Sequence, residues 1–129
     1  DYAWYNNDIG ATIYVDSNCD QRFEDRPLKD SLNSLTAGIR GSEEPIERPL
    51  FLDGREALMI QIKGSLDGVD IQMAAVAISK NQCLFDFVYI TRPEYFAKGF
   101  GDFYQMLHTF ESRNGWGNVL ESSSKHETP

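Results

Sequence analysis

Apolar and polar residues follow a two-residue alternation, or form short apolar runs, through much of the chain up to about residue 90. This pattern, rich in β-branched residues, predicts strands at 11–16, 55–63, 69–79 and 83–90. The segment 46–52 has a similar composition but contains Pro49, which cannot donate a backbone hydrogen bond. We therefore expect 46–52 to be an edge strand.

Short turn signals separate these strands. Asp53-Gly54 and Asp67-Gly68 are two-residue hairpin signals, and Lys80-Asn81 predicts a third turn. Consecutive strands joined by tight turns must be antiparallel. The middle of the chain therefore predicts an antiparallel meander.

Helical spacing precedes and follows this meander. Leu28, Leu32, Leu35 and Ile39 recur at intervals of four, three and four, which predicts an amphipathic helix from Pro27 to Gly41. Beyond the meander, the capping box 91–94 predicts a short helix that ends at Gly99. A final helix is then predicted from a second apolar stripe, and it ends at Asn114-Gly115. That stripe consists of Phe100, Phe103, Leu107 and Phe110.

The two central strands show how the sheet is covered. Residues 74–78 and 84–90 are apolar on both alternating faces, apart from Asp86. A strand that is apolar on both faces packs on both sides. We therefore predict an α+β fold, an αβα sandwich with helices on both faces of the sheet. We expect residues 1–120 to form one domain and residues 121–129 to be a disordered tail.

Charge and length narrow the range of functions. The 129 residues carry 12 basic and 20 acidic side chains, for a formal net charge of −8. Because the basic residues are not clustered, we expect no nucleic-acid binding. The sequence lacks a run of about 20 apolar residues that could span a membrane. Since it starts at Asp1, we expect membrane association only through a missing N-terminal signal or anchor.

Asp86 is the most informative candidate for chemistry. It interrupts an apolar strand, and burial of an unpaired carboxylate costs several kcal/mol. We therefore expect a buried polar network with a partner such as Arg55 or Arg40, which fixes strand register rather than performing catalysis. The other candidate is His108, for which we favour a packing or surface role. An enzyme that uses Asp86 or His108 remains the third functional alternative.

A metal or small-ligand site is the second alternative, and the acidic loop 16–25 would form it. Asp16, Asn18 and Asp20 are spaced like the start of a calcium loop. However, the positions for its turn glycine and its last ligand hold Gln21 and Pro27. We favour solvated acids there and predict no cofactor. The alternative site would use Asp16, Asp20, Glu24 and Asp25.

Two further groups of residues leave alternatives open. Cys19 and Cys83 form either a disulfide or two buried thiols. Trp4 and Tyr5 near the start of the chain, and Trp116 after the last helix, either pin the termini or contribute to an interface.

The order of elements resembles that of the PsbP-like and DcrB-like superfamily. The resembling residues are 52–58 (Leu-Asp-Gly-Arg-Glu-Ala-Leu), 83–87 (Cys-Leu-Phe-Asp-Phe) and 103–110, within a span of about 9–112. The resemblance implies an αβα sandwich in a bacterial envelope protein, periplasmic or secreted, and often an outer-membrane lipoprotein whose anchoring cysteine precedes the domain. It also implies a non-catalytic binding or assembly role with an unknown protein partner.

Overall fold

The computed structural model describes residues 2–6, 10–19, 27–80 and 83–109. Within these residues, seven strands, two α-helices and a short 3-10 helix follow one another. In chain order they are β1 (Tyr2–Asn6), β2 (Ala11–Asn18), α1 (Leu28–Thr36), β3 (Arg40–Gly41), β4 (Ile46–Leu52), β5 (Arg55–Leu66), β6 (Val69–Lys80), β7 (Cys83–Thr91), η2 (Pro93–Tyr95) and α2 (Phe96–His108).

The strands form one antiparallel sheet in the order β1-β2-β7-β6-β5-β3, and β4 also pairs with β5. β3 and β4 pair with different parts of β5, so both lie along the same edge. Asp53-Gly54 and Asp67-Gly68 connect the hairpins with positive φ at both residues. This is the type I′ geometry that suits two-residue hairpins, and the predicted meander is confirmed.

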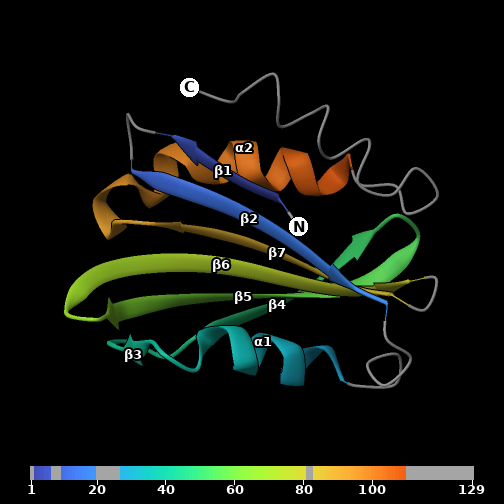
Figure 1. Cartoon of the computed structure of the whole chain (residues 1–129), viewed down its shortest axis with the longest axis horizontal. Coiled ribbons are helices and arrows are strands. Elements are labelled where there is room, and N and C mark those ends of the chain that lie inside the picture. The colour runs from blue at the N-terminus through green and yellow to red at the C-terminus, as the bar shows by residue number, and fades with distance from the viewer. Residues whose placement is uncertain (1, 7–9, 20–26, 81–82, 110–129) are drawn as a thin grey trace.

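The sheet lies between the two helices, with α1 on one side and α2 on the other (Figure 1). Alternate residues of each long strand join two separate cores. On β6, Ala75 and Ala77 belong to the core under α1, whereas Ala74, Val76 and Ile78 belong to the core under α2. We call these faces the α1 side and the α2 side. The predicted α+β sandwich, covered on both sides, is confirmed.

The α2 side is packed with aromatic rings. Tyr89 of β7 stacks on Phe103 of α2, with 5.5 Å between ring centroids. The Tyr89 hydroxyl donates a 3.0 Å hydrogen bond to the backbone carbonyl of Phe96. Both Tyr89 and Phe103 are buried, and full burial of one such side chain contributes about 1.5–3 kcal/mol. These contacts hold α2 against β7.

The first helix is shorter than predicted, and strands β1 and β3 were not predicted. The first helix ends at Thr36 instead of continuing to Gly41, because residues 40–41 form β3 and pair with β5. Ile39, which follows the helix, still packs against the α1-side core, and this explains why the apolar spacing continues beyond Thr36. The chain also begins with a strand, β1, which the sequence analysis did not predict.

A further correction concerns the predicted helix break at Gly99. A single helix runs through Gly99 and Gly101 from Phe96 to His108, because its buried stripe outweighs the cost of about 1 kcal/mol per glycine. Thr91, the first residue of the predicted capping box, ends β7, and Arg92 is the N-cap residue of η2. Neither α1 nor α2 has the length and apolar character to cross a membrane, and these are the α-helices among the described residues.

Candidate functional site

Asp86 faces another carboxylate. It lies on the α1 side of β7 between Leu84 and Val88, as its strand pattern predicts. The residue opposite Asp86 on β2 is Asp16, and the residue opposite it on β6 is Ala77. The Oδ1 atom of Asp86 is buried, and no described residue donates a hydrogen bond to it. The expected network with a basic partner is therefore not found among these residues.

The two arginines predicted as partners lie elsewhere. Arg55 is exposed beside the β4–β5 turn, and β6 separates its strand from β7. Arg40 is exposed on β3, where it lines a hollow of ≈ 310 Å³ with Asp67. The structure does not place Arg55 or Arg40 beside Asp86, because β6 lies between β7 and β5 in the sheet and β3 lies beyond β5.

The surroundings of Asp86 favour its protonated form. Burial, and then the charge of Asp16, raise its pKa from 3.8 to about 6. Tyr14 lies two residues before Asp16 on β2. Its pKa is raised by burial, then by the charges of Asp16 and Asp86. Among the described residues, no group of three or more acids, cysteines and histidines could hold a metal ion.

His108 and Asp86 are not brought together. His108 is exposed at the end of α2, where its ring contacts the edge of Tyr104 at 4.7 Å between centroids. α2 covers the side of the sheet opposite Asp86. The two residues therefore do not form a joint acid–base site, and the surface role expected for His108 agrees with its position.

Cys19 and Cys83 form a disulfide. Cys19 directly follows β2 and Cys83 begins β7, so the bond ties two neighbouring strands that are 64 residues apart in sequence. The disulfide lies at the start of β7, and the connection to α2 lies at the other end of that strand. Disulfides persist in oxidising compartments such as the periplasm or the extracellular space.

Several predicted site residues fall outside the described structure. Asp20, Glu24 and Asp25 of the acidic loop do so, as does Trp116. Trp4 and Tyr5 lie in β1, whose side chains are also outside the described part.

An open groove lies where α1 begins beside the β4–β5 hairpin. Its volume is ≈ 520 Å³, and a second hollow of ≈ 490 Å³ shares Leu28, Phe51 and Glu56 with it. We call the first hollow the α1–β4 groove. Its lining consists of Leu28, Lys29, Pro49, Leu50, Phe51, Glu56, Ala57 and Leu58.

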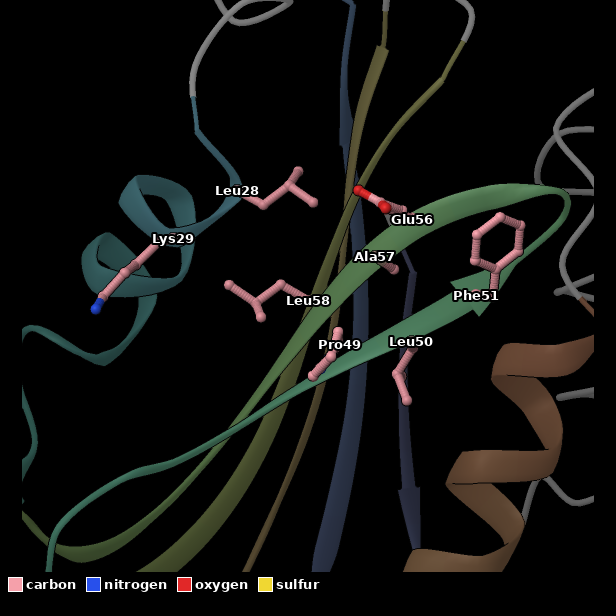
Figure 2. A pocket seen from close by; sticks show the side chains of 8 residues that line it. All are labelled: Leu28, Lys29, Pro49, Leu50, Phe51, Glu56, Ala57 and Leu58. Carbon is pink, nitrogen blue, oxygen red and sulfur yellow. The ribbon is translucent and has the colours of Figure 1, made fainter.

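The lining is mostly apolar, and one side of it is open. Figure 2 shows Leu28 reaching from α1 toward the hairpin and Glu56 pointing from β5 toward Leu28. Phe51 of β4 is 65% exposed, the highest value among the large apolar side chains described as exposed. An exposed ring of this size beside an apolar groove is typical of interaction sites.

Two ion pairs lie near the groove. Lys29 of α1 pairs with Glu47 of β4 at 3.2 Å, and both are substantially exposed. Lys80 at the end of β6 donates to the Asp53 carboxylate and to its backbone carbonyl, at 2.8 Å each. The Lys80–Asp53 pair is mostly buried and fixes the turn of the hairpin. Glu56 forms no ion pair with any described residue.

Sequence reasoning did not predict this groove, although it carried a signal. Segment 46–52 was correctly predicted as an edge strand from Pro49. Its consecutive Leu50, Phe51 and Leu52 are apolar on both faces. At a sheet edge, such a run leaves at least one large side chain without a covering layer.

Comparisons with known proteins add evidence on the fold. No protein-family model matches the chain, and no curated protein matches it either. Among solved structures, PA94 of Pseudomonas aeruginosa, a protein of unknown function suggested to be a regulator, has a TM-score of 0.62. It is 14% identical, and the match covers 84% of this chain and 78% of PA94.

LpqN of Mycobacterium tuberculosis, which is involved in cell envelope biogenesis, has a TM-score of 0.52 at 14% identity. That match covers 80% of this chain but only 62% of LpqN. At such low identity the likeness establishes a shared fold and no more. This chain is similar in fold to PA94 and to an envelope-biogenesis protein.

Proposed function

We propose that this chain is a non-catalytic binding domain of the cell envelope, which holds a partner protein in the α1–β4 groove. The observation that carries the proposal is Phe51, a large ring exposed beside an apolar groove of ≈ 520 Å³. Exposed aromatic residues are enriched in protein interfaces and often supply much of their binding energy.

Two observations support the envelope as the compartment. The Cys19–Cys83 disulfide suits an oxidising environment. The fold is shared with LpqN, whose involvement in cell envelope biogenesis is stated for that protein.

On this basis we also propose kinship with the PsbP-like and DcrB-like proteins and anchoring through residues upstream of Asp1. Incorporation of labelled palmitate into the full-length protein in its own cells tests the anchor, and its absence contradicts it.

Site-specific photocrosslinking tests the binding role. The photoreactive residue p-benzoylphenylalanine replaces Phe51 in one variant and Val69, exposed at the distant β5–β6 turn, in the other. We expect a discrete adduct with one envelope protein from position 51 and none from position 69. Equal crosslinking from both positions, or none from position 51, would contradict a partner site in the groove.

A further inference from the structure

The outer edge of β4 carries unpaired backbone groups. Opposed residues of an antiparallel pair alternate between hydrogen-bonded and non-bonded pairs, and a two-residue turn makes the pair that flanks it a bonded one. Leu52 and Arg55 flank the Asp53-Gly54 turn. The alternation therefore turns the backbone groups of Glu47, Pro49 and Phe51 away from β5. Among the described residues, no strand pairs with β4 on that side.

Pro49 lies at one of these outward positions, so it leaves the β4–β5 ladder intact. It removes one donor from the edge, which discourages open-ended pairing between sheets. The N–H groups of Glu47 and Phe51 and the C=O groups of Pro49 and Phe51 remain directed outward, whereas the outward C=O group of Glu47 accepts a 3.2 Å hydrogen bond from the Arg48 guanidinium. The four remaining groups can bind one further strand over a short length.

The same three residues place their side chains on the α1 side. Glu47 pairs there with Lys29 of α1, and Pro49 and Phe51 line the α1–β4 groove. A strand added to β4 would present every second side chain to the same side. Those side chains would lie over the groove, next to the apolar surface of Pro49 and Phe51.

Charge selects among possible occupants. Glu56 lies opposite Phe51 on β5 and has no ionic partner among the described residues. A lysine or arginine on an added strand can reach it over Phe51, since a long basic side chain also stacks on an aromatic ring. A second copy of this chain is disfavoured because each copy carries a formal charge of −8.

We infer that the β4 edge and the α1–β4 groove together bind an extended segment of a partner as an added strand. Its groove-facing side chains, two residues apart, include an apolar residue and a lysine or arginine. This inference rests on the proposed function and specifies the partner segment that the groove recognises. Peptide recognition by strand addition obtains affinity from backbone hydrogen bonds and specificity from alternate side chains.

The test uses synthetic heptapeptides of the pattern Thr-X-Thr-X-Thr-X-Thr, in which each X is phenylalanine, lysine or glutamate. Binding to the disulfide-bonded protein is measured from backbone amide shifts in NMR titrations. We expect peptides with both phenylalanine and lysine at X to bind, and the amides of Glu47 and Phe51 to shift most. Replacing lysine by glutamate in the peptide should weaken binding at least about threefold.

Two matched comparisons identify the binding mode. For a peptide that pairs antiparallel with β4, N-methylation at the X residues blocks the N–H groups that face β4, whereas N-methylation at threonines blocks groups that face away. Only the first should abolish binding. In the protein, Phe51→Ser should weaken binding about tenfold. Ile46→Ser should have little effect, because Ile46 is an exposed apolar residue on the other side of β4.

Each contrary result has a distinct meaning. Equal binding of both N-methylated peptides overturns strand addition, while photocrosslinking from position 51 would still support a partner in the groove. No binding by any peptide of the set also overturns the inference. A dimer of the free protein that Phe51→Ser dissociates would identify a second copy as the occupant and overturn the inference as well.

Discussion

Replacing Asp86 by asparagine should stabilise the protein at neutral pH. Asp86 is partly buried on β7, its Oδ1 has no donor among the described residues, and Asp16 lies directly opposite it on β2. α1 presents the buried Ser31 and Leu32 to the same side of the sheet. An ionised carboxylate in these surroundings is costly, whereas an amide of the same shape carries no charge to desolvate.

The size and sign of the effect follow from the pKa of Asp86. In the folded state it is raised from 3.8 to about 6. This difference is roughly two units, which corresponds to about 3 kcal/mol at 1.36 kcal/mol per unit. Partial exposure of the carboxylate makes this an upper limit.

The effect depends on pH in a defined direction. Below about pH 4 both states hold the proton, and the group contributes nothing. Between about pH 4 and pH 6 the folded state retains a proton that the unfolded state releases. Stability therefore falls as the pH rises through this window, and the full penalty persists above it.

Urea unfolding at several pH values from about 4 to 8, with the disulfide intact, measures this dependence. Asp86→Asn should raise the free energy of unfolding by about 2–3 kcal/mol at pH 7.5 and by little at pH 4. Asp16→Asn should give a smaller gain with the same sign. The control is Asp70→Asn at an exposed acid of β6. An Asp86→Asn variant that is less stable than the parent at pH 7.5 would refute the reasoning.

Three further predictions concern stability and are read from thermal or urea unfolding. Reduction of Cys19–Cys83 should cost about 4 kcal/mol, because the bond closes a loop of 64 residues; a loss below about 1 kcal/mol would contradict this. Gly64→Ala should destabilise the protein by about 2 kcal/mol or more, since its Cβ would collide with the Arg40 carbonyl of β3; an unchanged melting temperature would show that β3 moves freely. Gly101→Ala should stabilise α2 by about 0.5–1 kcal/mol, because no atom lies within 4 Å of its Cβ; a loss of stability would contradict this.

The sheet was largely predictable because its signals are local. Asp53-Gly54 and Asp67-Gly68 each form the turn of a hairpin, and apolar residues recur at alternate positions in the strands on either side. The helix break at Gly99 was wrong because a tertiary effect decided it. The packing of Phe96 and Phe103 on the sheet outweighs the local preference of glycine.

The candidate sites were less predictable because they depend on pairing between distant segments. The partner of Asp86 is set by β2, which lies about 70 residues earlier in the chain. Its pairing with β7 follows from the sheet order, which no local pattern encodes. A search for the nearest opposite charge therefore pointed to Arg55 and Arg40, while the sheet placed Asp16 beside Asp86.

The α1–β4 groove follows from a mismatch in length between layers. α1 has nine residues, which span about 14 Å at 1.5 Å per residue. β5 and β6 have 12 residues each and extend for about 40 Å. The helix can therefore cover only part of the α1 side, and it begins beside the hairpin turn, where Leu28 faces the strand ends. The apolar run of β4 extends beyond that cover, so Phe51 is exposed where the edge strand also has unpaired backbone groups.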